Sequence, residues 1–282
     1  MMTNPNKLVE KALDGDRQAI EDLILEVKDT IFNLSLRMLG NVHDAEDTTQ
    51  ETIIKVITKL STFRNESKFS TWVYKISVNH LLNYKKGMFS KMPPLSFEFY
   101  GQDNINGFME NNPALFQGVD EDLLAQELKM SCTNVMLLCF EPEDRIIYIL
   151  GTMFRVDSKI CGEVLDMSPE AYRKRLSRLR SKMSEFLSSY CELGASKTCS
   201  CKKRIGYAIT NHRLNPQSLE FSNLETLDSK LVQEYTNAME DIEEMSFTFA
   251  ELPKYKSPQT IINFVTDILA SNSMQKIQLE VQ

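Results

Sequence analysis

An acidic segment, DAEDTTQET, spans residues 44–52 and concentrates carboxylates within about two helical turns. On a helix, Asp44, Asp47 and Glu51 share one face at spacings of three and four, with Gln50 beside them. From these residues alone we favour a solvent-exposed acidic face near a helix N-terminus, where the helix dipole stabilises carboxylates.

A second segment, residues 69–86, combines aromatic side chains with a polar stripe. Ser70 is predicted to cap a helix, and Trp72 and Tyr74 offer flat surfaces on which an unstacked base could lie. Lysine suits phosphate, and asparagine can pair with base edges. The stripe contains Thr71, Lys75, Asn79, Asn83 and Lys86, with Arg64 just before the segment. The alternatives are core positions for Trp72 and for His80, and we favour that alternative for His80.

A third segment, residues 157–182, predicts two helices joined by a tight turn, as in a helix-turn-helix motif. Ser168 is the expected cap of the second helix, and Pro169 is its first residue. One stripe of this helix is apolar and begins at Tyr172, whereas its other faces are basic. The basic residues are Arg173, Lys174, Arg175, Arg178, Arg180 and Lys182. A solvated basic helix is the alternative, but the capped turn favours DNA binding in a major groove.

A fourth candidate site is a group of cysteines followed by a histidine. The four donors suit a tetrahedral zinc ion, and they are Cys191, Cys199, Cys201 and His212. Their spacing matches no standard zinc finger, so unliganded thiols in a loop are the favoured alternative. Cys132 and Cys139 lie among apolar residues, which predicts core positions for both.

The composition fits about two compact domains in 282 residues, with ordinary hydrophobic (42%) and charged (25%) fractions. The net charge of −7 argues against nucleic acid as a partner, but the charge is uneven. Residues 88–140 carry 2 basic and 7 acidic side chains, whereas residues 141–190 carry 9 and 8. Six cysteines do not suggest a disulfide framework. Because no signal peptide or membrane span is evident, we expect a cytoplasmic protein.

Helical periodicity predicts an all-α fold, and no stretch alternates for long enough to form a strand. The expected helices cover 8–39 (ended by Gly40), 44–60, 70–86 (ended by Gly87), 121–139, 142–154, 158–165, 168–189, 231–249 and 258–270. Residues 88–120 predict a partly extended linker docked through Phe97, Phe99 and Tyr100. The sequence offers no nucleophile–base constellation or phosphate loop, so an enzyme is not predicted.

Three of these segments resemble sequence blocks of the extracytoplasmic-function (ECF) sigma factors of bacterial RNA polymerase. DAEDTTQET is similar to their DAEDLVQET, and FSTWVYKISVNHLLNYKK is similar to their FRTWLYRIARNRALDYLR. SPEAYRKRLSRLRSKM resembles their recognition helix, S.GTVKSRLHRARAKL. The blocks occur in the family's order and cover roughly residues 8–87 and 121–190.

The resemblance implies two small helical domains joined by a flexible linker, followed by a mainly helical extension. Residues 1–90 would form sigma domain 2, 91–120 the linker, 121–190 sigma domain 4 and 191–282 the extension. Such a protein binds core RNA polymerase and directs promoter recognition, DNA melting and transcription initiation. Its partners would be core polymerase, promoter DNA and an anti-sigma or other targeting protein, with no membrane. No cofactor would be required, and zinc at the cysteine group is the one candidate.

The resemblance also implies roles for individual residues. Core-polymerase contacts would come from Asp44, Glu46, Asp47, Gln50 and Glu51, which overturns the solvated interpretation of that face. Contacts with the −10 element would come from Arg64, Ser70, Thr71, Trp72, Lys75, Asn79, Asn83 and Lys86. Contacts with the −35 element would come from Ser168, Tyr172, Arg173, Lys174, Arg175 and Arg178.

This chain departs from the family at Ile160-Cys161, where an Ile-Ala pair is usual, and at Tyr172, where a smaller aliphatic residue is usual. The extension resembles that of a cysteine-bearing subset. One hypothesis is that it restrains the two DNA-binding domains until a signal arrives, such as metal or thiol oxidation. Two other functions stay open: a helix-turn-helix regulator acting without core polymerase, and a helical adaptor that does not contact DNA.

Overall fold

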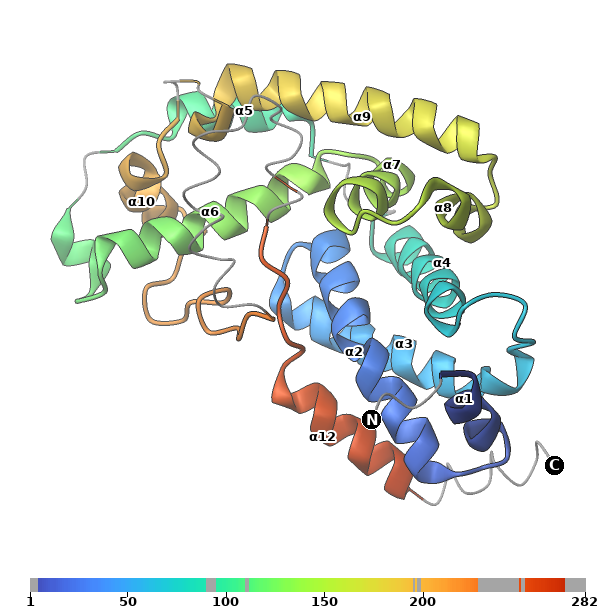
Figure 1. The fold of residues 1–282 in the computed structure, drawn as a ribbon. Helices are drawn as coiled ribbons and strands as arrows, with labels where there is room; N and C mark the ends of the chain where they lie inside the picture. The colour runs from blue at the N-terminus through green and yellow to red at the C-terminus, as the bar shows by residue number, and fades with distance from the viewer. Residues whose placement is uncertain are drawn as a thin grey trace.

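The computed structural model describes residues 5–89, 95–109, 112–194, 196, 199–227, 249 and 252–271. Within these residues the regular structure is helical, and the one β-bridge pairs Thr226 with Tyr255. The predicted all-α fold is therefore confirmed. Figure 1 shows α5–α10 packed over one end of a group that contains α1–α4 and α12.

The N-terminal half contains four helices, α1 (Pro5–Leu13), α2 (Arg17–Leu39), α3 (Val42–Thr58) and α4 (Phe69–Phe89). The predicted run over 8–39 is broken where Gly15 takes a φ of 86°, and Asp16 then caps α2. Gly40 ends α2 in the left-handed conformation, as predicted. The predicted end at Gly87 is wrong, because one glycine costs a helix only about 1 kcal/mol. The predicted cap at Ser70 is also wrong, because α4 already begins at Phe69.

The linker contains a helix that the sequence analysis missed, α5 (Phe97–Asn106), followed by a 3-10 turn (Pro113–Phe116). Ser96 starts α5 by accepting a hydrogen bond from the Phe99 amide at 3.0 Å. Phe97 and Tyr100 pack on Phe186 as expected, with ring centroids 5.2 and 6.1 Å away, but Phe99 is 62% exposed. The expectation of a partly extended linker is thus wrong over residues 97–106.

The C-terminal half follows the predicted helices closely. Its helices are α6 (Glu121–Leu138), α7 (Pro142–Tyr148), a π-helical turn (Ile149–Met153), α8 (Ser158–Leu165), α9 (Pro169–Tyr190), α10 (Cys201–Thr210) and α12 (Gln259–Ala270). Ser168 caps α9 by accepting from the Ala171 amide, as predicted. The helix α10 was not predicted, because residues 201–210 were interpreted as part of a cysteine group and the polar stretch after it. The predicted run over 231–249 lies outside the described residues, apart from Phe249.

The two predicted domains share their largest hydrophobic cluster. Met38 of α2 and Leu81 of α4 are fully buried in it, together with side chains from α6 to α9 such as Phe140 and Met183. A separate cluster in the N-terminal half contains Ile24 and Ile53, with residues of α12. The residues assigned to sigma domains 2 and 4 are consequently packed together in this structure.

A buried guanidinium joins the two halves. Arg145 is only 2% exposed, and its Nη1 donates to the Met38 carbonyl of α2 at 2.7 Å. Its other donors reach the carbonyls of Leu137 (2.8 Å), Leu138 (3.1 Å) and Phe140 (2.8 Å) at the end of α6. Burial lowers the pKa of Arg145 to about 10, so the side chain stays charged at neutral pH. One side chain thus satisfies carbonyl groups at the ends of two helices.

We expect Arg145→Met to lower the free energy of unfolding by about 2–4 kcal/mol, because it leaves buried carbonyls without donors. Urea denaturation followed by circular dichroism measures this loss. Arg178→Met, at an exposed position of α9, is the control and should change stability little. A loss below about 0.5 kcal/mol in Arg145→Met, within the usual surface range, would contradict the role assigned to the guanidinium.

Candidate nucleic-acid interface

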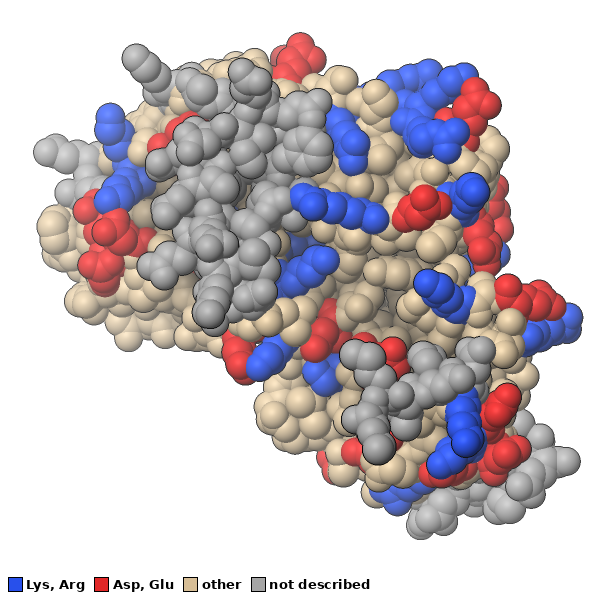
Figure 2. Space-filling view, viewed as in Figure 1, with Lys and Arg blue, Asp and Glu red and all other residues tan. Residues whose placement is uncertain are grey.

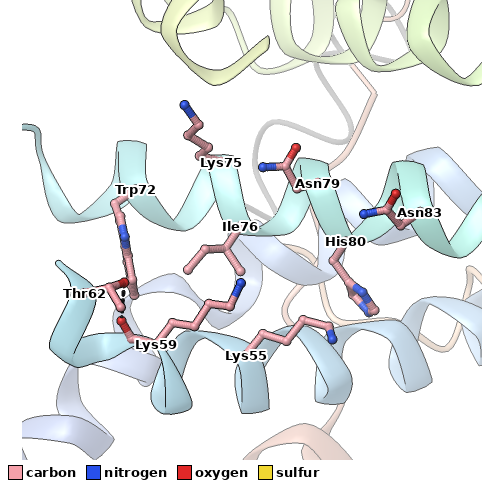
Figure 3. A pocket seen from close by; sticks show the side chains of 9 residues that line it. All are labelled: Lys55, Lys59, Thr62, Trp72, Lys75, Ile76, Asn79, His80 and Asn83. Atoms are coloured by element: carbon pink, nitrogen blue, oxygen red, sulfur yellow. Dashed lines mark hydrogen bonds between the residues drawn. The ribbon is translucent and has the colours of Figure 1, made fainter. Parts of the chain in front are cut away.

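A groove of about 390 Å³ lies between α3 and α4. Figure 3 shows α4 contributing the residues of one wall, while Lys55 of α3 and Lys59, which directly follows α3, reach in from the other. The lining residues are Lys55, Lys59, Thr62, Trp72, Lys75, Ile76, Asn79, His80 and Asn83. Four of the eight residues predicted for −10 contacts are therefore brought together, Trp72, Lys75, Asn79 and Asn83.

Trp72 belongs both to the groove wall and to an aromatic cluster. Its ring lies 5.4 Å from Phe63 and 5.7 Å from Phe69, measured between centroids. Phe63 and Phe69 are buried, which holds the half-buried indole in place. The two interpretations of Trp72, as a core anchor and as a stacking surface, are compatible in this position.

The groove is cationic, because three lysines and no carboxylate line it, although Asp166 of the neighbouring α8 end pairs with Lys75. Lys55 and Lys59 were not singled out from the sequence, although they follow Glu51 along one helical face at spacings of four. That stripe was a usable signal, but only the packing of α3 beside α4 shows that it lines the same groove as Trp72 and Ile76, whereas Lys75 points away from α3 (Figure 3). Lysine ammonium groups around an apolar and amide-bearing floor suit a phosphate next to an unstacked base.

His80 connects the groove with the acidic helix. Its Nε2 lies 3.0 Å from Oε2 of Glu51. Burial and the nearby Lys55 ammonium lower the pKa of His80 below its ordinary value of 6.5, against the opposite effect of Glu51. The imidazole is thus favoured in its neutral form at pH 7. It is partly buried, as the sequence analysis favoured.

The other predicted −10 residues lie elsewhere. Thr71 is 5% exposed and faces the interior, so the structure does not present it to DNA. Arg64 and Ser70 are exposed outside the groove lining. The side chain of Lys86 lies outside the described residues.

The second candidate surface is the basic helix α9. Figure 2 shows lysine and arginine side chains gathered where the N-terminal half of α9 lies beside α8. Arg173, Lys174 and Arg178 are exposed, whereas Arg175 is half-buried and its Nε donates to Asp144 at 2.6 Å. Of the predicted −35 residues, Arg173, Lys174 and Arg178 are therefore the ones whose side chains are accessible to a ligand. The Ser168 hydroxyl is engaged in capping α9.

Tyr172 is a core residue and not a surface contact, which corrects the prediction for this side chain. It is 1% exposed, and its hydroxyl donates to the Ile147 carbonyl at 3.2 Å. Cys161, the other departure from the family pattern, is buried beside it and interacts with its hydroxyl. The absence of a side chain at Gly151 leaves room for the Tyr172 ring, since a Cβ there would overlap Leu176 and the Tyr172 hydroxyl. The two departures therefore form one packing arrangement.

The predicted polymerase-binding residues lie on two sides of α3. Asp47 and Glu51 are exposed, and Asp44 and Gln50 are partly exposed. Glu46 points elsewhere and accepts a hydrogen bond from the Thr260 hydroxyl of α12 at 2.8 Å. Asp44, Asp47 and Glu51 share the exposed acidic face that the helical spacing predicted.

The predicted zinc ligands do not form a metal site. Among the described residues, no group of three or more His, Cys, Asp or Glu side chains is arranged to hold a metal ion. Burial raises the pKa of Cys191 and of Cys199 to about 12, and that of Cys201 also rises. These thiols are protonated at neutral pH, which slows oxidation because the thiolate is the reactive form. Cys139 is buried as predicted, and Cys132 is partly buried.

Comparison with known proteins gives several matches. The family described as Sigma-70 region 2 matches residues 23–87. The ECF RNA polymerase sigma-E factor of Haemophilus influenzae is 36% identical over 174 residues, which cover 61% of this chain and 89% of that protein. The ECF sigma factor SigW of Bacillus subtilis is 28% identical over 184 residues, 64% of this chain and 95% of that protein. The sigma-E factor of Escherichia coli K12 is 26% identical over 178 residues, 61% and 88% respectively.

The region-2 match places α2, α3 and α4 in the sigma-70 class. The Haemophilus relative extends the likeness over nearly the whole of its own length. The chain belongs to the ECF sigma factors of RNA polymerase, as its three sequence blocks predicted. About a third of it has no counterpart in the aligned parts of these relatives. Within the described residues no helix has the length and apolar character needed to cross a membrane.

The lowered pKa of His80 predicts a pH-dependent stability. The unfolded chain binds a proton near pH 6.5 and the folded chain only at lower pH, so stability should fall as pH drops below about 6.5. Urea unfolding of wild type and His80→Gln between pH 8 and pH 5 measures this effect. The wild type should lose stability relative to the variant as pH falls. If the wild type instead gained stability relative to the variant, the attraction of Glu51 would outweigh burial and raise the pKa of His80.

Proposed function

We propose that this chain is an alternative sigma factor that binds core RNA polymerase through α3 and directs initiation at promoters with −10 and −35 elements. The observation that carries the proposal is the groove between α3 and α4, cationic and walled by Trp72, which lies beside the acidic face of α3. A helix-turn-helix regulator that acts without core polymerase, or an adaptor that does not contact DNA, would not require this combination. The chain would act in the bacterial cytoplasm, with an anti-sigma protein as a further candidate partner.

In the proposed mechanism, the groove captures an unstacked base of the −10 element. Lys55, Lys59 and Lys75 neutralise phosphates of the strand, which provides affinity without sequence preference. A base lying against Trp72 regains the stacking that it loses on leaving the duplex. Amide groups of Asn79 and Asn83 can then pair with base edges. Melting is favoured because the groove binds the open strand and not the duplex.

Recognition of the −35 element is assigned to α9, with α8 as the first helix of the motif. The N-terminal part of a recognition helix is the part that usually meets base edges, and Arg173 and Lys174 lie there. Arg178 lies one to two turns further on, where a phosphate contact is expected. Arg175 supports α9 through its ion pair with Asp144 and is not a primary DNA contact in this proposal.

We expect the double substitution Asp47→Lys and Glu51→Lys to abolish binding to core polymerase, because it reverses the exposed charge of α3. Co-purification and titration with core polymerase measure the effect, and circular dichroism should show an unchanged fold. Glu10→Lys with Asp22→Lys reverses the same charge at two exposed positions outside α3 and should bind normally. Unchanged co-purification of the α3 variant would remove α3 from the interface.

We expect Arg173→Ala to weaken binding of the matching −35 sequence by about 1–3 kcal/mol. The measurement compares the matching duplex with duplexes changed one base pair at a time, at a fixed salt concentration. A base contact predicts that discrimination is lost at one position. Equal weakening on every sequence would make Arg173 a phosphate contact. Lys159→Ala, which lies in α8, is the control for loss of one positive charge.

A further inference from the structure

The C-terminal extension is attached first to domain 4. Ile205 and Ala208 of α10 are buried against Leu124 and Leu128 of α6. The Glu127 carboxylate of α6, 4% exposed, accepts backbone N–H groups of residues 220–222 at 2.6–3.0 Å. These contacts fix the first part of the extension along α6 (Figure 1).

The strap, defined here as residues 252–258, then runs along α2 of domain 2. Asn33 donates to the Tyr255 carbonyl at 2.7 Å and accepts from its amide at 2.8 Å. Asp29 accepts from both the amide and the hydroxyl of Ser257, each at 2.8 Å. Arg37 donates to the Pro253 carbonyl at 2.6 Å, and Asn33, Arg37 and Ser257 are all buried where the strap lies on α2. Because the strap itself covers these groups, its departure would expose them to water, which can then satisfy their hydrogen bonds.

The strap leads into α12, which covers parts of α2 and α3. Ile261, Val265 and Leu269 are at most 3% exposed and pack in the same cluster as Ile24 and Ile53. The Thr260 hydroxyl donates a hydrogen bond to the carboxylate of Glu46 in α3, one of the residues assigned to polymerase binding. The extension therefore begins on domain 4 and ends on the helix proposed to bind polymerase.

Domains 2 and 4 also contact each other directly, at the DNA-binding residues. Nζ of Lys75, which lines the groove, lies 3.1 Å from Asp166 and 3.4 Å from the Glu163 carbonyl, both at the end of α8. Elements named −10 and −35 lie about 25 base pairs apart, or roughly 85 Å along B-form DNA. Helices α4 and α8 in contact cannot occupy both elements at once. The structure is thus a closed arrangement.

We propose that the strap and α12 form an intramolecular clamp that keeps domains 2 and 4 closed, and that core polymerase binds with release of α12. This inference rests on the proposed sigma function. The relatives from Haemophilus, Bacillus and Escherichia align over 88–95% of their own lengths and leave about a third of this chain unmatched. The match to Sigma-70 region 2 covers residues 23–87, so α12 lies outside that region although it packs on its helices α2 and α3.

Val265→Glu tests the clamp, because it places a carboxylate in the buried face of α12. Thr266→Glu puts the same group at the neighbouring exposed position and is the matched control. Val265→Glu should increase the radius of gyration measured by X-ray scattering and bind core polymerase about tenfold more tightly. The control should match wild type on both measurements. An expanded Val265→Glu chain with wild-type affinity would overturn the inhibitory role.

Hydrogen exchange of the wild-type chain provides a second test that does not depend on any variant folding. Amides of α12 should lose protection when core polymerase is bound at saturation, while those of α9 should not. Full protection of α12 in the bound complex would overturn the clamp alone. Failure of the wild type and of Val265→Glu to bind a polymerase that binds the Haemophilus sigma-E factor would instead overturn the proposed function.

Discussion

The packing of α2 against α6 depends on the burial of Arg145 between two helix ends. A helix leaves its last carbonyl groups without partners, and both α2 and α6 end inside the molecule where water is scarce. The guanidinium donates to both ends at once, and its charge is tolerated because every contact is a carbonyl oxygen. The constraint fixes how α2 meets α6, and consequently how the two DNA-binding units face one another.

The groove between α3 and α4 is supported by an aromatic cluster. Phe63, Phe69 and Trp72 pack against one another, and Trp72 also lines the groove. The opening is lined by long cationic side chains, whose charged ends stay in water while their stems cover apolar surface. The groove is therefore a cationic surface with a rigid aromatic wall, built without burying an unpaired charge.

The C-terminal extension makes a second connection between the two halves of the molecule. It connects α6 to α2 and α3 through buried polar contacts of the strap, followed by one apolar helix face. These contacts suit the proposed role of the strap and α12 as a segment that is bound to α2 and α3 and then released. The thiols near α10 are protonated and partly or fully buried, and within the described residues they belong to no group of side chains arranged to hold a metal ion.

The sequence by itself determined the local features, because each depends on a few neighbouring residues. Ser168 and Pro169 start α9, Gly40 ends α2, and the spacing of Asp44, Asp47 and Glu51 places them on one face. The sequence blocks likewise identified the family.

Only the tertiary structure decided which side chains meet across helices. It brought Lys55 and Lys59 to the groove, moved Thr71 and Tyr172 into the core, and paired Arg175 with Asp144. Helix periodicity defines the faces of one helix but not its neighbour, since packing depends on side chains distant in sequence. For the same reason the contact between Lys75 and Asp166, 91 residues apart, had no signal in the sequence.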